Sequence, residues 1–221
     1  MKNLETIAER IRVNFAAKNT ARDSAVGRSR TLIRHCSLSI RASHRQERDE
    51  ALKQLEAARE IVVAIRADLA GYPDLYHAGY TQDALKEYAE ASIVFALFAG
   101  DVLPEPEALG VEYAAYLNGL GEAAGELRRR VLDIIRHNHG DEAERLLEAM
   151  DEIYLLLVTM DYPDAITGGL RRTTDLVRGV TERTRGDLTL SMRQARLQDE
   201  LRRLTGLSGD EHGATGAAAD A

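Results

Sequence analysis

Aromatic residues, proline and cysteine are all scarce in this 221-residue chain. It has no tryptophan, three phenylalanines, four prolines and one cysteine, and aromatic residues make up 5% of the total. A single cysteine excludes a disulfide framework and a zinc site built from several cysteines. The chain is instead rich in Arg, Glu, Ala and Leu, which favour helices over strands.

Long apolar runs are also lacking. A typical one, Ser92-Ile-Val-Phe-Ala-Leu-Phe98, is far shorter than the roughly 20 residues that cross a bilayer. The N-terminus carries Glu5 and Glu9 and no apolar core of an export signal. These features predict a soluble cytoplasmic protein that does not enter a membrane.

The charge of the chain is unevenly distributed. The formal net charge is −7, which argues weakly against a general polyanion binder. Residues 1–48 nevertheless hold 11 basic and four acidic side chains, whereas the remainder holds 18 basic and 32 acidic ones. The chain thus combines a basic N-terminal segment with an acidic body.

Proline and glycine mark where helices should end. We expect an all-α fold of six or seven helices in one domain over residues 1–205, followed by a disordered Gly/Ala-rich tail over 206–221. One or two long helices are expected over 1–72, with a break near Ser43–Arg48. Further helices are expected over 74–100, about 112–137, about 142–160 with Asp141 as N-cap, and about 164–204. A loop over 101–111 and a bend at Gly168–Gly169 interrupt them.

One face of the first helical segment carries a ridge of arginines. If the helix continues through them, its members fall within about 60° of one another: Arg30, Arg34, Arg41, Arg45 and Arg48. We expect Ile33, Cys36 and Ile40 on a separate, buried stripe. Arginine suits bidentate phosphate contacts, but a solvated face that pairs with neighbouring acids would have the same spacing.

Two glutamate pairs stand at helical spacing in successive helices. Glu87 and Glu90 precede an apolar segment, and Glu122 and Glu126 lie among Gly and Ala, which permit close helix packing. Together they can form an all-oxygen site for Mg²⁺, or for Mn²⁺ as a substitute. The alternative is ordinary ion pairing, for example of Glu126 with Arg130 at i+4.

Several segments, taken in order, resemble the translin family, and in particular its nuclease branch, translin-associated factor X. The matching stretches are Lys86-Glu-Tyr-Ala-Glu-Ala-Ser-Ile-Val-Phe95, Leu103-Pro-Glu-Pro-Glu-Ala-Leu-Gly110, Tyr116-Leu-Asn-Gly-Leu-Gly-Glu-Ala-Ala-Gly-Glu-Leu-Arg-Arg129, Asp151-Glu-Ile-Tyr154, Leu170-Arg-Arg-Thr-Thr-Asp175 and Thr184-Arg-Gly-Asp187. The resemblance covers roughly residues 5–190.

The resemblance implies a bundle of about seven helices that assembles into a closed, usually eight-membered ring and binds single-stranded RNA or DNA. In the nuclease branch, Glu87, Glu90 and Glu126 match glutamates of a Mg²⁺-dependent carboxylate site. Glu122 stands where that branch has an aspartate, which is one methylene shorter. Arg22 occupies the position of a nucleic-acid-contacting arginine.

Three functions remain open from the sequence. The first is a single-strand-binding endoribonuclease that uses Mg²⁺ at the four glutamates and holds RNA on the arginine ridge and Arg22. The second is a translin-like binding protein without catalysis. The third is an all-α nucleotide pyrophosphohydrolase, because Glu87 and Glu90 form a Glu-x-x-Glu pair.

A homo-oligomer is expected in any case, since a last helix of about 60 Å is longer than the diameter of a compact body of this size.

Overall fold

The computed structural model describes residues 3–136 and 140–210, and all regular secondary structure in these ranges is helical. The expected all-α class is confirmed for this part of the chain. The long helices are α1 (Leu4–His44), α2 (Arg48–Asp68), α4 (Gly79–Ala99), α6 (Tyr113–Ile135), α7 (Gly140–Val158) and α9 (Leu170–Asp210). Single turns form α3 (Pro73–Tyr76), α5 (Pro106–Leu109) and α8 (Asp164–Thr167).

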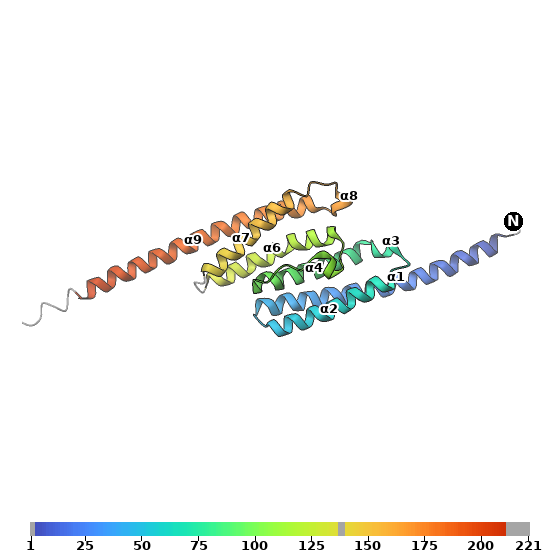
Figure 1. The fold of residues 1–221 in the computed structure, drawn as a ribbon, viewed down its shortest axis with the longest axis horizontal. Coiled ribbons are helices and arrows are strands. Elements are labelled where there is room, and N and C mark those ends of the chain that lie inside the picture. Colours follow the sequence, from blue (N-terminus) through green and yellow to red (C-terminus); the bar gives the residue numbers. More distant parts are fainter. Residues whose placement is uncertain (1–2, 137–139, 211–221) are drawn as a thin grey trace, which may run out of the picture.

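The long helices pack side by side in a layered bundle (Figure 1). The α1–α2 hairpin packs on α4, α4 packs on α6, and α6 packs on both α7 and α9. The N-terminal part of α1 and the C-terminal part of α9 extend beyond opposite ends of the bundle (Figure 1). No helix within the described ranges is both long enough and apolar enough to cross a membrane.

The helix breaks follow backbone conformation. α1 ends in a Schellman motif in which Gln46, with a φ of 60°, takes the left-handed position that glycine usually fills. The break expected near Ser43–Arg48 is therefore confirmed. Gly100 ends α4 in the same way, with a φ of 71°. Gly168 and Gly169 also have positive φ, and they separate α8 from α9.

Some boundaries differ from the expected ones. The segment 74–100 is divided into α3 and α4, with Thr81 Oγ1 donating to the Leu75 carbonyl oxygen across the join. The loop 101–111 contains the short helix α5, and Asp141 lies in the first turn of α7 and is not its N-cap. α9 continues through 206–210, so the tail expected over 206–221 does not begin at 206; residues 211–221 and 137–139 lie outside the described residues.

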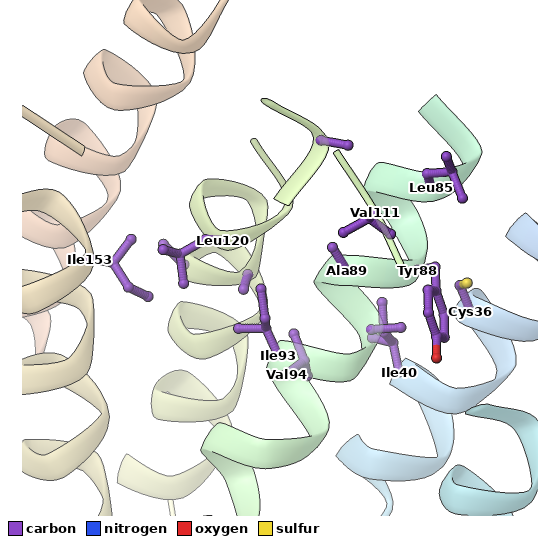
Figure 2. Close-up of a cluster of buried hydrophobic side chains, with 14 of the residues drawn as sticks. Cys36, Ile40, Leu85, Tyr88, Ala89, Ile93, Val94, Val111, Leu120 and Ile153 are labelled. Carbon is purple, nitrogen blue, oxygen red and sulfur yellow. The ribbon is translucent and has the colours of Figure 1, made fainter. Parts of the chain in front are cut away.

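The core is centred on α4, which is covered on two sides. Ile93 and Val94 are adjacent in sequence and both fully buried, because α4 lies between α1 and α6 (Figure 2). Cys36 and Ile40 of α1 pack on one side of α4, as expected from their spacing. Ile33 does not join them: it is 36% exposed, because the buried stripe of α1 follows Ser29, Leu32, Cys36 and Ser39–Ile40.

α4 and α6 approach each other closely at Gly119. A Cβ atom placed there would lie 2.7 Å from the Lys86 carbonyl oxygen and 2.9 Å from the Glu90 amide nitrogen, both in the backbone of α4. Only glycine fits at that distance. Gly125, six residues further along α6, is exposed and would place a Cβ in open space.

We expect opposite effects from alanine at these two glycines. Gly119→Ala would push α6 away from the α4 backbone and lower the free energy of unfolding by about 1–3 kcal/mol. Gly125→Ala, the matched control in the same helix, would raise it by roughly 0.5–1 kcal/mol through reduced backbone entropy. Urea denaturation measures both; equal effects at the two positions would show that α4 and α6 are not in close contact at Gly119.

Candidate functional site

Three carboxylates meet where α4 and α6 are closest. Glu87 and Glu90 project from one face of α4, and Glu122 comes from α6, one turn after Gly119. One carboxylate oxygen from each of the three lies within 4.8 Å of the others. We call these three residues the carboxylate cluster. The structure therefore brings together three of the four glutamates that the sequence indicated.

Burial and mutual repulsion set the charge of the carboxylate cluster. Glu90 is 8% exposed, and its burial, followed by the fields of Glu87, Glu122 and Glu126, raises its pKa from 4.5 to about 8. Burial also raises the pKa of Glu87, while Lys86 opposes that shift. The neighbouring residues therefore do not fully neutralise the negative charge of the cluster, and binding of a proton or a cation is favoured.

Lys86 is the cation nearest to the cluster in the described structure. Its Nζ donates to Glu122 Oε1 at 2.6 Å and lies 3.6 Å from Glu87 Oε1. Burial alone would lower the pKa of Lys86, but the hydrogen bond to Glu122 and the fields of Glu122, Glu87 and Asp83 outweigh it, so the pKa is raised. Sequence reasoning missed this role, because Lys86 stands next to Glu87 and its main partner lies 36 residues away.

Glu126 lies beside the cluster but is not part of it. His44 Nε2 donates to Glu126 Oε2 at 2.5 Å, and Arg129 lies 3.8 Å from the same oxygen. The hydrogen bond from His44 lowers the pKa of Glu126, against the opposing effect of burial. The pairing with Arg130 that we considered is not seen; Arg130 binds Glu142 instead. His44 was also missed, since 82 residues separate it from Glu126.

The donor set of the cluster fits a divalent ion. Three carboxylates offer only hard oxygen donors, which Mg²⁺ and Mn²⁺ prefer. Glu87 and Glu122 keep part of their side chains open to solvent, at 31% and 38% exposure, so an ion and its waters have an approach. Glu90 lies deeper and closes the site from inside.

The arginine ridge is shorter than expected. Arg30, Arg34 and Arg41 are exposed on α1 and form no ion pair with any residue that the structure describes. α1 ends at His44, so the two remaining arginines leave that face. Arg45 pairs with Glu47 and Arg48 with Asp101, and the Arg48 guanidinium lies 4.9 Å from the centroid of the Phe95 ring.

Arg22 does not lie on the face of Arg30, Arg34 and Arg41. It is exposed on α1 and pairs with its neighbour Asp23 at 3.0 Å. At 100° per residue, Arg22 lies about 80° away from Arg30 around the helix. Of the six arginines expected to bind nucleic acid, the structure thus groups three, Arg30, Arg34 and Arg41, and separates Arg22, Arg45 and Arg48 from them.

The protein is a bundle of long helices with a carboxylate cluster between α4 and α6. No family model matches the sequence. The uncharacterized protein MJ0175 of Methanocaldococcus jannaschii is 30% identical over 195 residues, which are 87% of this chain and 86% of that protein.

Solved structures give the family. AfC3PO in complex with duplex RNA matches with a TM-score of 0.80 and 32% identity, over 86% of this chain and 98% of that one. AfC3PO alone has a TM-score of 0.78 at the same identity and coverage. Apo-NeC3PO, at 22% identity and a TM-score of 0.74, shares the fold. C3PO is a translin/TRAX complex, and the chain belongs to the translin family.

The raised pKa of Glu90 predicts how stability depends on pH. Between pH 4.5 and 8 the folded protein holds a proton on Glu90 that the unfolded chain releases, so this group makes the protein less stable as pH rises. In EDTA, Glu90→Gln should therefore stabilise the fold by roughly 2–4 kcal/mol at pH 8 and by almost nothing below pH 4.5. Denaturation curves across this range measure the difference.

The matched control for this prediction is Glu148→Gln on the exposed face of α7. It removes the same charge from an exposed position, so it reports the effect of losing one carboxylate away from the cluster. A Glu90→Gln effect that is constant from pH 5 to 8 would mean that Glu90 ionises freely in the folded protein.

Proposed function

We propose that the chain binds RNA and is a Mg²⁺-dependent endoribonuclease whose active site is the carboxylate cluster. The observation that carries the proposal is the convergence of Glu87, Glu90 and Glu122 within 4.8 Å. A divalent ion bound there would activate a water molecule and offset charge on the attacked phosphate. The complex of AfC3PO with duplex RNA supports RNA as the ligand class.

Each side chain of the site has a distinct task in this proposal. Glu87 and Glu122 hold the ion at the open side of the cluster, and Glu90 holds it from the buried side. Glu126 is held in place by His44 beside the cluster. From there it orients a water molecule or one of the carboxylates that bind the ion. Mn²⁺ should replace Mg²⁺, because both ions accept oxygen ligands.

The arginines that remain together on α1 are the proposed contacts to the RNA backbone. Arg30, Arg34 and Arg41 are exposed and have no acidic partner among the described residues, so their guanidinium groups are free to bind phosphates. Arg22 and Arg45 would first have to leave Asp23 and Glu47. Such contacts position a strand without reading its sequence, so single-stranded RNA or DNA is accepted.

Binding without catalysis is the second candidate, and one contact favours it. The Lys86–Glu122 hydrogen bond gives the cluster a counter-ion of its own, so the carboxylates can be accommodated without a metal. A cleavage assay in Mg²⁺ and in EDTA, with single-stranded and duplex RNA, separates the two candidates. The nucleotide pyrophosphohydrolase ranks last, because the second pair, Glu122 and Glu126, is a Glu-x-x-x-Glu pair and only Glu122 joins the cluster.

If the cluster is catalytic, its members should act as a unit. Glu87→Gln, Glu90→Gln or Glu122→Gln should each lower the rate of RNA cleavage by roughly a hundredfold or more, and the triple variant should be little worse than a single one. RNA affinity should change little, because the cluster holds the ion and not the strand. Gel-based cleavage and filter binding measure the two properties separately.

Glu148→Gln again serves as the control and should cleave like the wild-type protein. Glu126→Gln should have a smaller effect than the three cluster variants, because Glu126 lies outside the cluster. Normal cleavage by Glu90→Gln would remove the cluster from the mechanism.

Binding by the α1 arginines should depend steeply on salt. For single strands, log affinity falls with log salt at roughly 0.7 per phosphate neutralised. Arg30→Ala/Arg34→Ala should weaken binding to all sequences alike and reduce this slope by roughly 1. Arg171→Ala/Arg172→Ala, which removes two exposed arginines from α9, is the matched control. Equal slopes for the two double variants would contradict an RNA surface on α1.

The proposal includes a homo-oligomer, expected to be an octameric ring as in the family. Large apolar side chains are exposed on both protruding helices, among them Ile11 and Phe15 on α1 and Leu190 and Leu197 on α9. A partner subunit is the simplest cover for such surfaces. Light scattering behind a sizing column should give about 195 kDa for eight chains of 24.4 kDa. A mass near that of one chain at micromolar concentration would exclude the ring.

A further inference from the structure

Lys86 makes the most direct contact with the carboxylate cluster of any cation in the described ranges. Its Nζ is 2.6 Å from Glu122 Oε1 and 3.6 Å from Glu87 Oε1, and its side chain is only 21% exposed. A largely buried ammonium group loses hydration free energy, and only a strong interaction with a partner offsets this loss. The ammonium therefore belongs to the charge balance of the cluster and is not a surface charge that happens to lie near it.

The position of Nζ conflicts with a divalent ion on the same carboxylate. A metal binds a carboxylate oxygen at about 2.1 Å, and the ammonium already occupies Glu122 Oε1 at 2.6 Å. Both cations on that oxygen would stand less than about 5 Å apart, and their repulsion in a partly buried site is large. Binding of the ion to that oxygen therefore favours departure of the ammonium.

Asp83 is an alternative partner for the Lys86 ammonium. Asp83 lies one turn before Lys86 on α4, is exposed, and already acts on Lys86 through its field. Four rotatable bonds let the lysine swing from Glu122 towards Asp83 without movement of the backbone. The displaced ammonium would then face solvent beside the cluster.

We propose that Lys86 is the resident counter-cation of the carboxylate cluster, and that a divalent ion binds by displacing its ammonium from Glu122. This inference rests on the proposed function only in taking the cluster as the place where the ion binds. Lys86 is thus a positioning residue: it neutralises the cluster when no metal is bound, and it sets how tightly the metal is held.

The test is titration of the metal-free protein with Mn²⁺ in a calorimeter. Lys86→Met keeps the length of the side chain and removes its charge, so it should bind Mn²⁺ roughly tenfold more tightly than the wild-type protein, or better. Lys53→Met, the matched control, removes the same charge from the exposed face of α2 and should leave the affinity unchanged.

A second measurement uses the unaltered protein, so it does not depend on how the variant folds. Acetylation by an N-hydroxysuccinimide ester, followed by mass spectrometry, reports how accessible each lysine is. Saturating Mn²⁺ should speed acetylation of Lys86 relative to Lys53 in the same sample, because the ammonium leaves Glu122.

The outcomes distinguish this inference from the proposed function. Wild-type binding with no gain in Lys86→Met over Lys53→Met, or with no change in Lys86 acetylation, overturns the role of Lys86 and leaves the metal site standing. Absence of Mn²⁺ binding in all three proteins overturns both. Binding by Lys86→Met alone would mean that Lys86 blocks the wild-type site: Lys86 would remain the counter-cation of the cluster, and its displacement by the ion would be overturned.

Discussion

The approach of α6 to α4 at Gly119 is the contact on which the site depends. With no Cβ at this position, α6 can rest against the Lys86 carbonyl and the Glu90 amide of α4. One turn later, Glu122 is delivered to the level of Glu87 and Glu90. A pair of helices held at the ordinary 8–10 Å separation by larger side chains would keep these carboxylates further apart. The geometry of the cluster is thus a consequence of backbone packing.

Close packing of carboxylates creates an electrostatic cost that the surrounding residues offset. Lys86 neutralises Glu122, His44 binds Glu126, and Glu90 has its pKa raised to about 8. These contacts come from three different helices, α1, α4 and α6, so the charge balance also ties the first half of the chain to its centre. A site that is stable in the absence of metal and still rich in oxygen donors is suited to reversible ion binding.

Much of the helix order could be predicted from the sequence, because proline and glycine mark helix ends through local geometry. The breaks at Gly100 and at Gly168–Gly169 are of this kind, and so is the spacing that places Glu87 and Glu90 on one face of α4. The break after α1 is predicted near Ser43–Arg48, but its residue is not, because Gln46 fills the left-handed position without being glycine. The arginine ridge requires the helix to continue past this break, and it therefore ends with Arg41.

Contacts between distant segments could not be predicted by periodicity. Lys86 and Glu122 are separated by 36 residues and His44 and Glu126 by 82, and each pair meets only because α1, α4 and α6 pack together. The glycines of α6 showed that some helix would come close, but not that Gly119, rather than Gly125, would be the point of contact. The resemblance to translin located the glutamates without giving their counter-ions.

The central claim is that Glu87, Glu90 and Glu122 form one site for a divalent ion. Crystals soaked in Mn²⁺ test it directly, because anomalous scattering locates the metal without assumptions about the ligands. The account predicts one strong peak between α4 and α6, at about 2.2 Å from an oxygen of each of the three carboxylates, with Lys86 Nζ moved away from Glu122. A saturated crystal with no peak at the cluster and Lys86 still on Glu122 would contradict it.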